Sequence, residues 1–465
     1  MNRGTGIMIV AAALAVAGAV AMRPSTAPPP SFEDTGELLF PEFEDPNTAV
    51  FLEVVAFDED EARMTSFSVK LEGGRWVIPS HNSYPADGTE RMGKAAASFI
   101  GAEKDVVRSD DANDHVEFGV LAPTDEADEE EARGQRVTIK NAAGTALVDI
   151  IIGKDVPNKR GFKFVRYPGE NRVYATQIDP QISTKFTDWI EEDLLKLDAG
   201  NIVAVLSNSY TVDEQTGSVS DDAPQYFEFG GSDDPSPVGM PSPVGMPSLD
   251  GMPSKEWFLS ELPMVGTKGE PIDRATYVPE EGMPELPPPP SAPEGQELDP
   301  SKVKQVVSAA DRLKIVGVRP QPEQLSAIDL LSKGFFVGGE PPNQRLFGNE
   351  GEVRLFAADG VVFTLYFGEV TFASGEVLSA GGEGEEQGEA AEGANARANR
   401  YMFVGVGYDP RRDLGAGETP DPGQLRGQDR AQALAERFNK WFYVIPDSSF
   451  TQLHKDPADF WRDQQ

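Results

Sequence analysis

The chain contains no cysteine among its 465 residues. That absence excludes disulfides, thiol catalysis, iron–sulfur clusters and thiolate zinc sites, so the folded parts depend on core packing. Basic residues are also scarce, with 41 Lys and Arg against 77 Asp and Glu and a net charge of −36. A surface so negative repels phosphate backbones, and we expect no nucleic-acid partner. Solubility is the simplest explanation of the charge.

The N-terminus carries an uncharged, largely apolar segment, residues 4–22, directly after Arg3. As a helix this segment reaches about 28 Å, close to the hydrocarbon thickness of a bilayer of about 30 Å. Residues 1–23 are therefore either a retained single-pass anchor or a cleaved signal peptide, since Ala17-Gly-Ala19 and Ala19-Val-Ala21 both fit the small-residue cleavage pattern. Because Arg3 satisfies the positive-inside rule either way, we expect the body on the far side of the membrane.

Composition divides the rest of the chain into folded and unfolded stretches. The predicted segments are a Pro-rich spacer (24–35), a first module (36–217), a Pro/Gly/Met-rich linker (218–298) and a second module (299–465). A six-residue repeat from Ser236 has Pro and Gly in every copy, which excludes a helix or a central strand there. We expect a semi-stiff disordered linker, in which the apolar residues 255–259 pack back on a domain.

Each module begins with an amphipathic helix. In the first, Asp87 is placed to cap the helix, with Glu90 three residues later as in a capping box. In the second, Asp299 is the expected cap and Pro300 the first helical residue. The apolar stripes predicted to face the core are Met92, Ala95, Ala96, Phe99 and Ile100, and Val303, Val306, Val307, Ala310 and Leu313.

Strand pairs follow the helix in both modules. The first pair in each is a hairpin, with alternating apolar residues around a Gly-containing turn. The predicted strand segments are 137–139, 147–153, 162–168, 172–178 and 188–190, then 353–355, 361–368, 400–406, 441–445, 450–453 and 459–461. The second module carries insertions at 374–398 and 409–440, the latter with a helical stripe from Ala431 to Phe438. Aromatic residues that alternate along these strands are expected in the core rather than on a ligand platform.

These patterns predict an α+β fold. We expect two tandem related modules, each a helix packed on a twisted antiparallel sheet, plus an N-terminal transmembrane helix. The alternative is that two unrelated α+β domains share the order of helix and hairpin.

Candidate chemistry is sparse. The three histidines are His81, His115 and His454, and we expect His81 to be an exposed loop residue. A hydrolase would require His81 or His115 to meet a serine and a carboxylate in a cleft, and adjacency of Ser80 or Ser83 in the sequence does not establish that geometry.

Metal and nucleotide sites are also not indicated. The acidic runs 58–61, 110–114 and 125–131 lack the alternating ligands, central glycine and distal glutamate of a calcium loop. Gly405-Val-Gly407 lacks the third glycine of a dinucleotide fingerprint, and no phosphate-binding loop is present. We predict no catalytic, cofactor-binding or metal-binding residue and no cofactor.

Several short segments form a pattern seen elsewhere. They are Trp76-Val-Ile78, Tyr84-Pro-Ala-Asp87, Phe118-Gly-Val-Leu-Ala-Pro123, Ile152-Gly153 at the end of a hairpin, and Val173-Tyr174. In these residues the chain resembles a bacterial family known as domain of unknown function 4340, over about residues 36–215 with a weaker echo in 299–465. The long linker and the acidic insertions depart from a compact member.

The resemblance implies an envelope protein with one N-terminal membrane segment, often encoded beside ABC-transporter genes of the gliding type. The family has no established catalytic residues, so none is carried over. We therefore expect a single-pass protein of the bacterial cell membrane with a periplasmic body. Its expected role is a non-catalytic accessory or scaffold subunit that contacts ABC permease or ATPase subunits. The alternative is a secreted or anchored binding module for an envelope polymer or ligand.

Overall fold

The protein is described from a computed structural model. It describes residues 34–58, 63–125, 132–213, 218–220, 224–230, 255–262, 290–322, 326–338, 344–373, 375–381, 398–413, 415 and 424–464. The predicted anchor, the spacer up to residue 33, the six-residue repeats and the Gly/Glu-rich residues 382–393 lie outside these ranges. No helix in the described ranges is both long and apolar enough to cross a bilayer. The fold is α+β, with mostly antiparallel sheets and few helices, as the sequence predicts.

Internal packing divides the chain into two compact units. Unit 1 comprises residues 1–49, 55–57 and 93–181, and unit 2 comprises residues 50–54, 58–92 and 182–465. The boundary falls within strand β1 (Phe51–Asp58).

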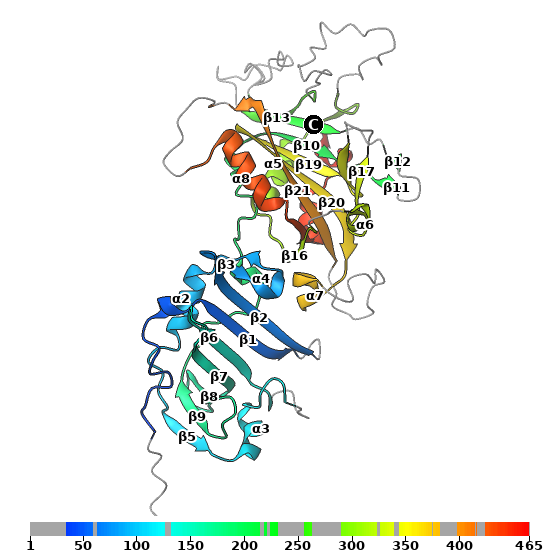
Figure 1. The fold of residues 1–465 in the computed structure, drawn as a ribbon. Coiled ribbons are helices and arrows are strands. Elements are labelled where there is room, and N and C mark those ends of the chain that lie inside the picture. The colour runs from blue at the N-terminus through cyan, green and yellow to red at the C-terminus, as the bar shows by residue number, and fades with distance from the viewer. Residues whose placement is uncertain are drawn as a thin grey trace, which may run out of the picture. The chain divides into compact units, whose positions relative to one another are not determined.

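The first sheet has nine strands in the order β4-β3-β2-β1-β6-β7-β8-β9-β5 (Figure 1). Its other strands are β2 (Arg63–Glu72), β3 (Arg75–Ile78), β4 (Tyr84–Pro85), β5 (Val106–Ser109), β6 (Gln135–Lys140), β7 (Ala146–Asp155), β8 (Phe162–Arg166) and β9 (Val173–Gln177). The short helices of this region are α2 (Thr89–Ala97), α3 (His115–Phe118) and α4 (Phe186–Trp189). The predicted hairpin at residue 144 is confirmed, because β6 pairs antiparallel with β7 and Gly144 has a φ of +83° in the turn.

The second sheet lies in unit 2 and has eight strands in the order β14-β13-β10-β19-β20-β21-β22-β16. They are β10 (Ile202–Asn208), β13 (Gln225–Gly230), β14 (Glu256–Leu259), β16 (Gly317–Pro320), β19 (Glu352–Ala357), β20 (Asp359–Thr371), β21 (Asn399–Asp413) and β22 (Trp441–Pro446). The helices are α5 (Pro300–Asp311), α6 (Ala327–Leu331), α7 (Gly375–Ala380), α8 (Gly427–Phe438) and α9 (Asp447–Leu453). Three strand pairs complete the unit: β11 (Val212–Asp213) with β12 (Ser218–Val219), β15 (Gln296–Leu298) with β23 (Trp461–Asp463), and β17 (Phe335–Gly338) with β18 (Arg345–Gly348).

The two sheets share one strand order. The first contains the series β1-β6-β7-β8-β9-β5, and the second contains β10-β19-β20-β21-β22-β16. In each sheet, the strand at the end of the series (β5 or β16) follows a helix (α2 or α5) in the chain. The four strands β6 to β9, or β19 to β22, come after it and form a meander. Strands β2 and β13 then extend the two sheets in the same way, beside β1 and β10.

The prediction of a disordered linker over residues 218–298 is wrong where the chain forms strands β13, β14 and β15. Strand β14 pairs antiparallel with β13, and Trp257 on it is buried, so residues 255–259 pack on a domain as predicted. The repeats dominate the composition of this region. For that reason the short alternating segment Gln225–Gly230, between β10 and the repeats, is not predicted as a strand. The second sheet also takes β10 from residues that the sequence assigned to the first module.

Three segments expected to be strands are wholly or mostly helical, one of them residues 459–461, where a 3-10 helix (Pro457–Phe460) precedes β23. Residues 188–190 overlap α4, where the Trp189 indole Nε1 donates to the Ser183 carbonyl oxygen at 2.7 Å. Residues 450–453 belong to α9, and the ring of Phe450 stacks on that of His454 at 4.8 Å. Rings four residues apart are neighbours on a helix, so this pair stabilises the helical turn.

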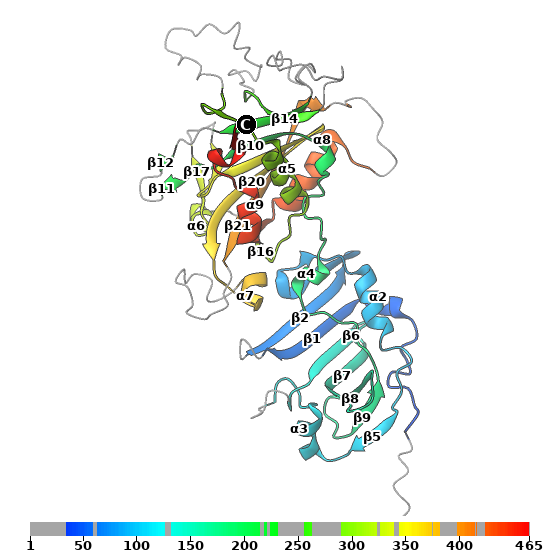
Figure 2. The same ribbon diagram turned by 180° about the vertical axis from the view of Figure 1, so that it is seen from behind.

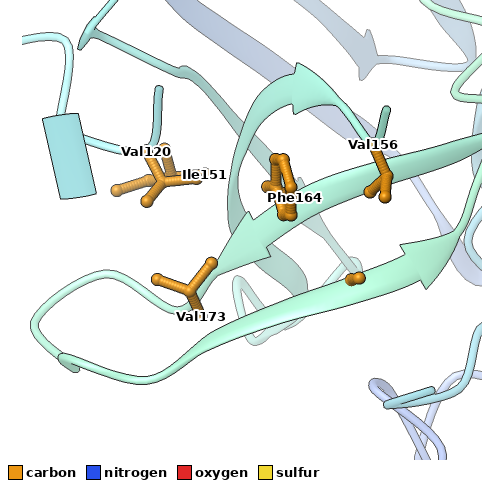
Figure 3. Close-up of a cluster of buried hydrophobic side chains, with 6 residues drawn as sticks. Val120, Ile151, Val156, Phe164 and Val173 are labelled. Carbon is orange, nitrogen blue, oxygen red and sulfur yellow. The ribbon is translucent and has the colours of Figure 1, made fainter. Parts of the chain in front are cut away.

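The core of unit 1 contains residues of the segment 118–123, one of the short segments in which the chain resembles a known family. Val120, Ile151, Phe164 and Val173 form a buried cluster with Val156 and Ala175 (Figure 3). The backbone around Val120 approaches β7 closely, because a Cβ on Gly153 would lie 2.4 Å from the Phe118 carbonyl oxygen. The buried Arg166 Nε donates to the Val120 carbonyl oxygen at 2.8 Å. Only glycine permits this approach of the two backbones.

We expect Gly153→Ala to lower the free energy of unfolding by about 1–3 kcal/mol through overpacking against the carbonyl of Phe118. Gly93→Ala is the matched control, since a Cβ there meets nothing within 4 Å. Within helix α2 that change is expected to stabilise by about 0.5–1 kcal/mol. Urea denaturation of both purified variants measures the difference, and a Gly153→Ala protein as stable as wild type would contradict the close packing.

Candidate functional site: a basic trough along helix α5

Helix α5 forms as its sequence predicts. The Asp299 carboxylate accepts hydrogen bonds from Ser301 N at 3.0 Å and Ser301 Oγ at 2.6 Å, and Pro300 is the first helical residue. Those hydrogen bonds, that of the hydroxyl first, lower the pKa of Asp299. The buried side of the helix consists of Val303, Val306, Val307, Ala309 and Ala310. Its polar side is therefore left to face outward.

Helix α5 lies next to α9 (Figure 2). Two adjoining hollows lie along the polar side of α5. The first, of about 770 Å³, is lined by residues of α5, of the start of β10 and of β13, β14 and β23. The second, of about 460 Å³, is lined by Ser301, Lys304, Gln305, Ser308, Arg312, Gln452 and Lys455. Ser301, Lys304 and Ser308 line both hollows. We call the two hollows together the trough.

Cations line the trough from three distant parts of the sequence. Lys255, Lys304 and Arg462 border the first hollow, and Lys304, Arg312 and Lys455 border the second. The first hollow also holds two acids, Glu256 and the capping residue Asp299, whereas none of the described acidic residues lines the second. The trough is thus locally basic in a chain whose net charge is −36.

The cations of the second hollow have no carboxylate partner in the part of the chain that the structure describes. Arg312 Nε donates to the Ser308 carbonyl oxygen at 3.2 Å, and Lys455 Nζ donates to the Thr451 carbonyl oxygen at 2.9 Å. Lys304 is exposed and forms no hydrogen bond or ion pair within the described residues. By contrast, Arg462 pairs with Glu297 at 2.9 Å. Unpaired cations beside a hollow are suited to binding an anionic ligand.

The first hollow has an aromatic wall. Trp257 is buried and packs against Phe229, whose side chain is 40% exposed, with ring centroids 5.3 Å apart. Ile202 and Val307 line the same hollow, so apolar and charged groups border one space. Such a combination of an apolar wall and a few polar groups is typical of ligand sites.

His81 does not lie in an exposed loop, and that expectation is wrong. Its side chain is buried and its ring stacks on Phe186 at 4.6 Å. Nδ1 lies 3.0 Å from Ser80 Oγ, and Nε2 lies 2.9 Å from Ser379 Oγ. Burial first, and Arg319 second, lower the pKa of His81 to about 4. His81 thus meets two serine hydroxyls, and no carboxylate contacts its ring in the described residues.

The other histidines occupy structural positions. His115 is buried, and its Nε2 lies 2.8 Å from the Asn171 carbonyl oxygen. His454 packs on Phe450 and Phe367, and burial lowers its pKa.

The described acidic run, residues 110–114, makes local contacts. Asp110 pairs with Arg172 at 2.6 Å, Asp111 accepts from Asn113 N at 2.9 Å, and Asp114 accepts from Ser109 Oγ at 2.5 Å. Most of the runs 58–61 and 125–131 lies outside the described residues. Among those that are described, no group of three His, Asp or Glu side chains is arranged to hold a metal ion.

Fold and trough together define an α+β protein with a basic, ligand-sized recess on one helix. The family model described as Domain of unknown function (DUF4340) matches residues 76–333, more than half of the chain. The chain belongs to this family, as the resemblance of its short segments indicates. No curated protein and no solved structure matches the sequence.

Sequence reasoning missed the trough. The polar stripe Ser301, Lys304, Ser308 and Arg312 is visible as the complement of the apolar stripe on α5. It gave no functional signal, because a polar outer face is the ordinary state of a surface helix. The remaining cations come from β14 and the C-terminal residues, whose proximity only the fold reveals.

Acid is expected to destabilise unit 2 through His81. The pKa of the imidazole is about 4 in the fold and 6.5 in the unfolded chain, so the unfolded state takes up the proton first as the pH falls. The His81 contribution to the free energy of unfolding is fully present above pH 6.5. It falls by about 3 kcal/mol as the pH is lowered from 6.5 to 4. Urea denaturation at pH 7.5 and 4.5 measures it.

The His81→Gln variant should show a weaker dependence of stability on pH over this interval. Ser80→Ala is the control, because it removes the hydrogen bonds of Ser80 Oγ to His81 Nδ1 and from Ser68 N but keeps the imidazole, and it should keep the wild-type pH dependence. An unchanged pH dependence in His81→Gln would show that other groups cause the acid sensitivity.

Proposed function

We propose that this chain is a membrane-anchored, extracytoplasmic accessory subunit of an ABC-type envelope transport system, which acts by binding rather than by catalysis. The observation that carries the binding role is the trough, where three cations that have no carboxylate partner among the described residues border a recess of about 460 Å³. The charged and hydrogen-bonding groups that line this recess come from α5, from α9 and from residues directly after these helices.

The chain belongs to the family described as Domain of unknown function (DUF4340), and our placement in an envelope transport system extends to it what the resemblance implies, a gene often found beside ABC-transporter genes. The uncharged residues 4–22 support an anchor, and the acidic, cysteine-free body is compatible with either side of a membrane. We further propose that the two halves are related modules, each a helix packed on a twisted antiparallel sheet. The shared strand order of the two sheets supports a duplication, since unrelated α+β domains have no reason to place the helix and the end strand alike.

The proposal predicts stable contacts with transporter subunits. Crosslinking in intact cells, followed by purification of the tagged chain from membranes and mass spectrometry, should recover ABC permease or ATPase subunits. The matched control replaces residues 1–23 by a cleavable signal peptide, which should release the body and reduce the recovery. Wild-type chain found alone in the soluble fraction and shortened to begin near Met22 would contradict the anchored accessory role.

A second candidate is a secreted or anchored binding module for an envelope polymer. The aromatic wall of the first hollow favours it, because Phe229 is exposed beside cations on a surface open to a long ligand. The two candidates differ in whether transporter subunits are recovered with the chain.

A further inference from the structure

We propose that the trough binds an anionic glycan: a linear sugar polymer that carries carboxylate groups, as uronate polymers do. The inference rests on the binding role proposed above and names the class of ligand. It does not depend on the identity of the transporter.

The charges are spaced for a polymer rather than gathered for a single ion. Lys304 and Arg312 are eight residues apart on α5, which separates their backbones by about 12 Å along the helix axis. Lys455 borders the same hollow from the end of α9. Lys255 and Arg462 border the first hollow together with Glu256 and Asp299, so the excess of positive charge lies in the second hollow. A chain with one carboxylate on each of several sugar units can meet cations placed along such a row.

The uncharged lining suits sugar hydroxyls. Ser301, Ser308, Gln305 and Gln452 place hydroxyl and amide groups between the cations. Hydroxyls and amides both donate and accept hydrogen bonds, as sugar hydroxyls do. The exposed ring of Phe229 supplies an apolar surface at the other end of the trough.

Other ligand classes fit less well. A peptide is commonly recognised by addition to a sheet edge or by apolar anchors of a helix in a groove. The polar residues that line the second hollow offer neither mode, and the edge strand β14 and the apolar wall border the first hollow alone. The charge of −36 repels every polyanion beyond the trough, so a phosphate polymer is distinguished from a uronate by the titration below.

The test is calorimetric titration of the full chain in detergent with an oligogalacturonate. A neutral maltooligosaccharide of equal length, an oligoglutamate and a polyphosphate are titrated in parallel. We expect the oligogalacturonate to bind, to bind more weakly at high salt, and to bind more tightly than the three comparison ligands. Equal or tighter binding of oligoglutamate or polyphosphate, or no binding of the oligogalacturonate, would overturn the proposal.

Two lysines on one turn of α5 make a matched pair of variants. Lys304→Ala should weaken oligogalacturonate binding about tenfold, the effect of losing one charge-assisted hydrogen bond. Lys302→Ala removes the same charge two residues away, outside the lining of the trough, and should leave affinity unchanged. Lys455→Gln, on the opposite wall, should weaken binding like Lys304→Ala. If Lys302→Ala and Lys304→Ala weaken binding equally, the effect is one of net charge and the proposed site is wrong.

The glycan experiment and the crosslinking experiment are independent tests, so one proposal can fail while the other holds. Glycan binding without recovery of transporter subunits removes the transport role and leaves the ligand assignment standing. Recovery of transporter subunits without glycan binding overturns the ligand assignment alone.

Discussion

The architecture of unit 2 depends on burying the apolar side of α5. The chain must pass from β14, at one end of the eight-stranded sheet, to β16 at the other, and α5 is the helix of this crossing. In a protein without disulfides, each fully buried Val or Leu contributes about 1.5–3 kcal/mol, and several of them hold α5 in place. Once the apolar side is buried, the polar side must face outward, and its contacts with α9 and β14 create the trough.

Local sequence patterns predicted part of the fold well, including the helix of this crossing. The Asp299 cap, Pro300 and the apolar stripe are contiguous signals, and each is found as predicted in α5. The hairpins β6–β7 and β19–β20 likewise follow from alternation around a turn. Strands β13 and β14 were not predicted, because each has few residues and lies beside repeats that exclude regular structure by composition. Their assignment to a sheet depends on pairing, which is not a local property.

The trough and the environment of His81 could not be predicted for a related reason. Lys255, Lys304 and Lys455 are separated by about fifty to one hundred and fifty residues, and only the meeting of β14, α5 and the C-terminal residues brings them to one surface. His81 lies among polar and turn-forming neighbours, which predict exposure. Its burial comes from Phe186 and Ser379, far along the chain. Sequence reasoning therefore recovered elements and missed the surfaces and cores that distant elements form together.

Strands β10, β13 and β14 have a consequence for how this protein can be divided. All three precede residue 299, yet they supply three of the eight strands of the second sheet. A fragment that began at Asp299 would expose the edge of β19, and unpaired strand edges promote aggregation. A fragment that contains the whole eight-stranded sheet must therefore begin near residue 199, before β10, and keep β13 and β14 joined to the residues after 299.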